Sequence, residues 1–117
     1  MKSYKELKAW QLSIEIVTDV YRITKTFPQE ELFSLTNQIR RAVVSIPSNL
    51  AEGHYRQGSK EFAQFVQIAF GSLAEVETQL YIARKLDYLT DNQYQLTADK
   101  LDHLSRMLNK LIIALRK

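Results

Sequence analysis

The segment from Gln38 to Gly53 holds the densest set of side chains that could form hydrogen bonds or bind a ligand. On a helical wheel its polar residues fall on one side: Gln38, Arg41, Ser45, Ser48, Asn49 and Glu52. Serine and asparagine are weak helix formers, so they are poor choices for an ordinary solvated face beside Pro47. We therefore predict a structural polar network in which Arg41 pairs with Glu52, or with Glu75 from a neighbouring helix. A ligand site and a plain solvated face are the alternatives.

Residues that would support catalysis or metal binding are few. The chain has no cysteine, and its two histidines, His54 and His103, match no metal-ligand spacing. Glu75 and Glu77 are two residues apart on a helix and point to different sides, so they do not form an acid–base pair. The sequence also lacks a phosphate-binding glycine loop and a nucleophile elbow. We predict a protein that is not an enzyme, with no catalytic residue, no metal site and no cofactor.

Basic residues around the end of the same segment are the remaining lead. Arg56 and Lys60 lie near Tyr55 in the sequence, and Arg40 lies earlier, in the predicted second helix. Cations beside an aromatic ring can hold phosphate and a stacked base. The formal net charge is only +3, which permits an anionic partner without demanding one. We predict that Arg40, Arg56 and Lys60 contact nucleic acid, with RNA as the first candidate and DNA as the second.

Four helical segments must position these residues. Apolar residues recur at steps of three and four, which predicts helices over residues 4–26, 30–52 and 59–86 and a fourth through Leu101–Leu115. The chain has 117 residues, of which 45% are hydrophobic, and this is enough for one compact core. We predict a single all-α domain over residues 1–117, folded as an antiparallel up-and-down four-helix bundle.

Local signals mark where three of these helices begin or bend. Ser3 with Glu6 forms a capping box, which we expect to open the first helix. Thr90 with Gln93 forms a second capping box ahead of the fourth helix. Pro47 should kink or restart the second helix, because proline removes one backbone donor and crowds the preceding turn.

Two of the predicted helices carry more apolar surface than one core needs. Leu7, Trp10 and Tyr21 form one apolar stripe on the first helix, which also has a second apolar stripe. The third helix likewise has an additional apolar stripe. Exposed in a monomer, the additional stripes would be unusually large apolar patches. We predict that they form a homo-oligomer interface containing Leu12, Ile16, Ile23, Ile68, Gly71, Ile82 and Leu86. A monomer with broad core faces is the alternative.

Signals for export or membrane insertion are missing from the sequence. No apolar run approaches the roughly 20 residues that span a bilayer, and the N-terminus leads into no secretion-type apolar segment. The lack of cysteine fits a reducing compartment. We expect a cytoplasmic protein with no membrane partner.

The polar segment also carries a recognisable signature. The run Ser45-Ile46-Pro47-Ser48-Asn49-Leu50-Ala51-Glu52-Gly53, with Gln38-Ile39-Arg40-Arg41-Ala42 before it and Gly71-Ser72-Leu73-x-Glu75 after it, resembles the bacterial 23S rRNA intervening-sequence protein family. The similarity extends over nearly the whole chain. The resemblance implies a four-helix protomer that assembles into a ring-like homopentamer and has no established enzymatic activity.

The resemblance also suggests partners. A similar pentameric bundle is the accessory protein of diversity-generating retroelements, which binds a reverse transcriptase and nucleic acid. By this likeness the chain is expected to bind RNA or DNA, or a protein partner such as a polymerase. The alternative is a protein–protein adaptor or scaffold with no direct nucleic-acid role. Salt separates the two, because phosphate binding weakens steeply as ionic strength rises whereas apolar docking does not.

Overall fold

The structure is a computed structural model that describes residues 3–117. These residues form four long helices, two short 3₁₀ helices and the connections between them. In chain order they are η1 (Tyr4–Glu6), α1 (Lys8–Thr24), η2 (Gln29–Glu31), α2 (Leu35–Tyr55), α3 (Ser59–Lys85) and α4 (Asp91–Leu115). Residues 3–117 contain no β-strand, so the all-α prediction is confirmed for them. Met1 and Lys2, which the predicted domain includes, lie outside the described residues.

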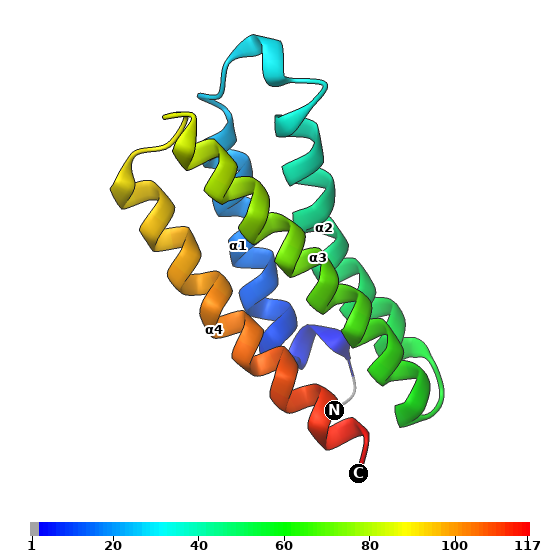
Figure 1. Cartoon of the computed structure of the whole chain (residues 1–117). Coiled ribbons are helices and arrows are strands. Elements are labelled where there is room, and N and C mark those ends of the chain that lie inside the picture. Colours follow the sequence, from blue (N-terminus) through cyan, green and yellow to red (C-terminus); the bar gives the residue numbers. More distant parts are fainter. Residues whose placement is uncertain (1–2) are drawn as a thin grey trace.

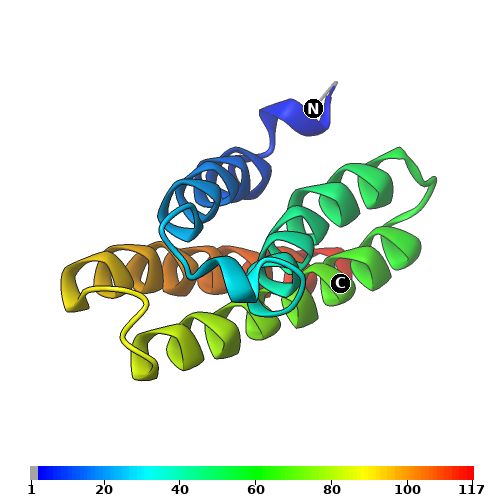
Figure 2. The same ribbon diagram turned by 90° about the horizontal axis from the view of Figure 1, so that it is seen from above.

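The long helices run alternately up and down as an antiparallel bundle (Figure 1). Each helix packs against its neighbours in the sequence, and α4 returns to pack against α1. In the view of Figure 2, α1 and α2 form one layer of the bundle and α4 and α3 form the other, with α1 packed against α4 and α2 against α3. We call the end with η2 and the α3–α4 connection the upper end, and the end with η1, the α2–α3 connection and the last turn of α4 the lower end (Figure 1).

A close approach of α2 to α3 near the lower end depends on Gly53. A Cβ atom placed on Gly53 would lie 2.6 Å from the Cβ of Phe65 and 3.0 Å from the Phe62 ring. Such distances are well inside van der Waals contact, so a larger residue would push the two helices apart. Gly53 therefore fixes the spacing of the two helices whose ends carry Arg56 and Lys60.

The helix α2 differs from its prediction at both ends and in the middle. It begins at Leu35 rather than at residue 30, because residues 29–31 form the separate turn η2. It passes through Pro47 as one continuous helix and ends at Tyr55, beyond the predicted residue 52. The restart predicted at Pro47 is therefore wrong, and the basic residues after α2 are delivered by an uninterrupted helix.

The first helix is shorter than predicted, and its core face is a different one. The Ser3–Glu6 capping box is present but caps η1; the extended backbone of Leu7 then separates η1 from α1. The buried face of α1 consists of Ala9, Ser13, Ile16, Val20 and Thr24. Ser13 and Thr24 can be buried because their hydroxyls donate to carbonyl oxygens of the same helix, each at 2.7 Å.

The buried face of α1 shows that part of the predicted oligomer interface is wrong. Ile16 is fully buried in the core of the protomer, so its assignment to a contact between copies is wrong. Leu12 and Ile23 pack half-buried against the same core. The remaining predicted residues lie on α3 or directly after it: Ile68, Ile82 and Leu86 are exposed, and Gly71 has open space where a side chain would stand. No helix within residues 3–117 is long and apolar enough to cross a membrane.

Candidate nucleic-acid interface

Part of the predicted polar network forms a small cluster between α2 and α3. The hydroxyl oxygens of Ser45 and Ser72 are 2.9 Å apart. Asn49 Nδ2 donates to the carbonyl oxygen of Ser45 at 2.8 Å and to its hydroxyl oxygen at 2.9 Å. Polar groups between packed helices need such internal partners. The cluster therefore links α2 to α3 and has a structural role.

Other members of the predicted network line a groove of about 390 Å³ between the same two helices. Gln38, Arg41 and Glu75 all border it. The expected pair of Arg41 with Glu52 is wrong, because Glu52 instead binds Arg56 one turn away at 3.1 Å. Arg41 and Glu52 are eleven residues apart on one helix, about 16 Å along its axis, which puts them out of reach of each other. Arg41 and Glu75 also form no ion pair within residues 3–117, and Ser48 is exposed.

Arg40 does not join the other two residues predicted to bind nucleic acid. Its Nε donates to the Thr24 hydroxyl at 2.9 Å, and its guanidinium lies 4.8 Å from the centre of the Tyr21 ring. It is sixteen residues from Arg56 on the same helix, which corresponds to about 24 Å. Arg40 therefore ties α2 to α1 in the upper half of the bundle, and the prediction of one surface containing all three residues is wrong.

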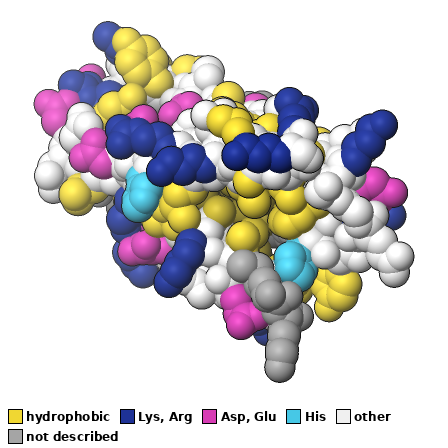
Figure 3. Space-filling view, turned by 90° about the horizontal axis from the view of Figure 1, so that it is seen from below, with side chains coloured by type: hydrophobic (Ala, Val, Ile, Leu, Met, Phe, Trp, Pro, Cys, Tyr) yellow, Lys and Arg dark blue, Asp and Glu magenta, His cyan; other side chains and the backbone are white. Residues whose placement is uncertain are grey.

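Lys60 belongs to a cluster of cations at the lower end. It lines a cavity of about 440 Å³ together with Arg116 and Lys117 from the end of α4. Within residues 3–117 none of these three side chains forms an ion pair. Figure 3, in which the bundle lies lengthwise, shows Lys and Arg side chains along this face of the molecule, beside an exposed apolar area. Three cations without acidic partners around one cavity can together hold an anion such as phosphate.

Arg116 and Lys117 are missing from the residues predicted to bind nucleic acid, although the sequence holds the signal for them. In an antiparallel bundle the first turn of one helix lies beside the last turn of the next. Lys60 begins α3 and Arg116 follows α4, so the predicted topology already places them at one end. Arg56, the third predicted residue, lies at this end but is held by Glu52 and by the Phe65 ring, 5.2 Å away.

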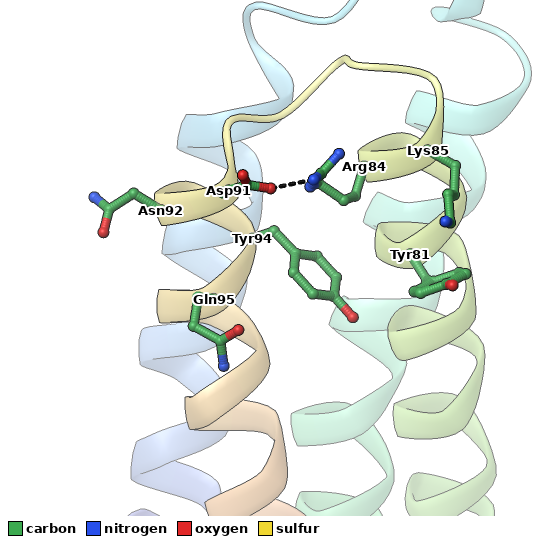
Figure 4. A pocket seen from close by; sticks show the side chains of 7 residues that line it. All are labelled: Tyr81, Arg84, Lys85, Asp91, Asn92, Tyr94 and Gln95. Atoms are coloured by element: carbon green, nitrogen blue, oxygen red, sulfur yellow. Dashed lines mark ion pairs between the residues drawn. The ribbon is translucent and has the colours of Figure 1, made fainter.

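A second cavity, of about 620 Å³, lies between α3 and α4 at the upper end and has a different character. Figure 4 shows Arg84 reaching from α3 across its top to Asp91 on α4, with which it forms an ion pair. Arg84 also lies 3.8 Å from Asp87. The Lys85 ammonium group stands 5.5 Å from the centre of the Tyr81 ring. Both cations here already have partners within the protein.

The histidines do not assemble a metal site. His54 packs edge-on against the Phe62 ring with 5.8 Å between ring centres, and His103 is exposed on α4. No group of three His, Asp or Glu side chains within residues 3–117 is placed to hold a metal ion.

Comparison with known proteins places the chain among its relatives. The family model of the 23S rRNA-intervening sequence protein matches residues 5–110. A crystal structure of a protein with unknown function from the S23 ribosomal protein family of Bacteroides thetaiotaomicron VPI-5482 superposes with a TM-score of 0.82. The two sequences are 23% identical, and the match covers 89% of this chain and 97% of the other. At this identity the likeness concerns the fold alone. No curated protein matches the chain. Since the family model covers most of the sequence, this chain belongs to the 23S rRNA-intervening sequence protein family.

Proposed function

We propose that this protein is a non-enzymatic bundle that binds RNA through its lower end. The observation that carries the proposal is the cavity lined by Lys60, Arg116 and Lys117, three cations with no acidic partner within residues 3–117. Phosphate groups of a nucleic acid supply the missing negative charge, and the counterions that they release drive binding. DNA offers the same phosphates and is the second candidate ligand.

The charge of the whole lower end supports the proposal. Residues 3–8, 52–61 and 110–117 contain seven basic side chains: Lys5, Lys8, Arg56, Lys60, Lys110, Arg116 and Lys117. The same stretches contain three acidic side chains, Glu6, Glu52 and Glu61. This excess exceeds the net charge of +3 of the entire chain. The positive potential is therefore concentrated at one end of the bundle, where it attracts a polyanion more strongly than an even distribution would.

We further propose that the protein assembles as a homo-oligomer, a ring-like homopentamer as the family resemblance implies. Ile68, Ile82 and Leu86 leave apolar surface exposed on α3, and Gly71 leaves room there for another backbone to approach. Burying this surface against a second copy would remove it from water. Each added copy would also repeat the basic lower end, which strengthens binding to one long nucleic acid.

The test is a titration of fluorescently labelled RNA at about 50 and 200 mM salt, with light scattering for mass. For three phosphate contacts we expect affinity to fall roughly tenfold or more over this range. The variant Lys60→Glu with Arg116→Glu should bind on the order of 100-fold more weakly, since each lost charge-assisted contact contributes more than 1 kcal/mol. Lys25→Glu with Lys85→Glu, which changes the net charge by the same amount at the upper end, is the matched control and should change affinity little.

Four outcomes would contradict these proposals. Equal loss in both variants would mean that only net charge matters, and unchanged binding in the double variant would remove the lower end as the site. Binding of a protein partner such as a polymerase, with no retention of RNA at either salt concentration, would support the adaptor alternative. A monomeric mass would exclude the homopentamer.

A further inference from the structure

Tyr55, the last residue of α2, presents an aromatic ring to solvent at the lower end. It is 79% exposed, although aromatic side chains usually bury most of their surface. The centre of the Tyr4 ring lies 5.9 Å from that of Tyr55, and the Tyr4 ring packs edge-on against Trp10 at 5.3 Å. The Tyr4 ring, itself packed on Trp10, therefore supports Tyr55 from one side while most of the Tyr55 surface stays open.

Cations accompany this group of rings. Arg56 directly follows Tyr55, and Lys5 directly follows Tyr4. The Arg56 guanidinium already binds Glu52 at 3.1 Å and lies 5.2 Å from the centre of the Phe65 ring, so it leaves less free positive charge than Lys60 does. An open ring at the end of the bundle that also carries Lys60 and Arg116 suits a nucleotide, because the ring can stack on the base while a cation of this end meets the phosphate.

Phe33 at the upper end shows that exposure alone does not make such a site. It is 90% exposed, more than Tyr55. Glu30 and Glu31 of η2 precede Phe33 in the chain, with Leu32 between them and the ring. Their carboxylates repel phosphate. Of these two exposed rings, Tyr55 alone combines an open aromatic surface with flanking positive charge.

We infer that Tyr55 stacks on an unpaired base, so that the ligand class of the lower end is single-stranded RNA rather than duplex RNA. This inference rests on the proposed function. In a duplex the bases stack on one another and the deep, narrow major groove keeps side chains away from them, so the ring would find no open base. One base stacked on an aromatic ring strengthens binding roughly 5- to 100-fold.

The experiment compares two RNAs of equal length, a fluorescent oligouridylate and a duplex, on three variants. Tyr55→Ala should weaken oligouridylate binding roughly 5- to 100-fold and leave duplex binding nearly unchanged. Tyr55→Phe keeps the ring and should bind both RNAs like the wild type. Phe33→Ala removes an even more exposed ring at the other end and should also bind like the wild type.

The outcomes separate this inference from the proposed function. If the wild type binds neither RNA, the proposed function fails and the inference fails with it. If it binds RNA but Tyr55→Ala weakens both RNAs equally or neither, the inference alone is overturned.

A second readout is the emission of Trp10, the single tryptophan of the chain, which contacts Tyr4. Emission should change when oligouridylate binds the wild type and should not change in Tyr55→Ala. The same emission change in both proteins would overturn the stacking.

Discussion

The two ends of the bundle use similar residues with opposite results. At the upper end, residues 22–35 and 84–93 carry four basic and four acidic side chains, and Arg84 is shared between Asp87 and Asp91. At the lower end, the seven basic side chains face only three acidic ones, and Lys60 has no acidic partner within residues 3–117. At the upper end Arg84 is therefore already paired with acidic side chains, whereas Lys60 at the lower end remains available for a ligand.

Aromatic residues follow the same division. At the upper end the Tyr88 hydroxyl donates to Glu31 Oε2 at 2.8 Å, and the Tyr88 ring packs on Phe27 at 5.4 Å. At the lower end Tyr55 has one ring neighbour and remains largely open. The comparison teaches that residue type and exposure are weak guides to a site. The informative quantity is how much of the bonding capacity of a side chain is already used within the protein.

The lower end can be disturbed most strongly at Gly53, which sets the spacing between α2 and α3. Gly53→Ala should destabilise the protein by about 1–3 kcal/mol, because the added Cβ would lie 2.6 Å from the Phe65 Cβ and both helices would have to shift. Thermal unfolding followed by circular dichroism measures the effect. The matched control is Gly71→Ala on α3, where an added Cβ meets nothing within 4 Å. That variant should gain up to about 1 kcal/mol from helix propensity in the protomer. Equal effects at the two glycines would refute the tight contact at Gly53.

The contrast between the two ends can be tested by removing the ion pairs of the upper end. Asp87→Asn with Asp91→Asn would free Arg84 beside Lys85, and asparagine tolerates the positive φ of 62° at position 87. If internal pairing is what keeps this end from binding, RNA affinity at low salt should rise roughly two- to fivefold, in line with the modest strength of exposed ion pairs. The labelled-RNA titration measures it. Adding Lys85→Glu should cancel the gain, and no gain in the double variant would mean that pairing does not distinguish the two ends.

The parts of this fold that the sequence predicts are those set by neighbouring residues. The Thr90–Gln93 capping box opens α4 as predicted, because both of its hydrogen bonds join residues three apart. The sequence pattern predicts the wrong core face for α1, because Ser13 and Thr24 are polar residue types. Their hydroxyls bind carbonyl oxygens of their own helix, and this lets them be buried with Ile16.

The candidate site divides in the same way. That Lys60 and Arg116 share one end follows from helix order alone, so it could be predicted from the sequence. That Arg40 bonds Thr24, and that Arg56 rather than Arg41 takes Glu52, depends on where long side chains reach in three dimensions. Periodicity says which face a residue occupies, but it does not say which partner on another helix lies within 3 Å.

The smallest effect, and the finest test of the upper end, comes from the hydrogen bond between Tyr88 and Glu31. Hydrogen bonds from Ser34 first, and from Tyr88 second, lower the pKa of Glu31 below its ordinary 4.5. A lowered pKa in the folded state means that this carboxylate stabilises the fold above about pH 4.5, and that the stabilisation is lost as the pH falls through the lowered pKa. Tyr88→Phe removes one donor, so the pKa of Glu31 measured by NMR should rise toward 4.5, and the stability difference from the wild type should shrink in acid. Ser34→Ala should raise the pKa further, because Ser34 is the larger cause.

RNA binding should not change in either variant, since both act at the end whose groups already bond one another. An unchanged Glu31 pKa in Tyr88→Phe would mean that the hydroxyl does not hold the carboxylate. A loss of RNA binding would place the ligand across both ends and end the distinction between them.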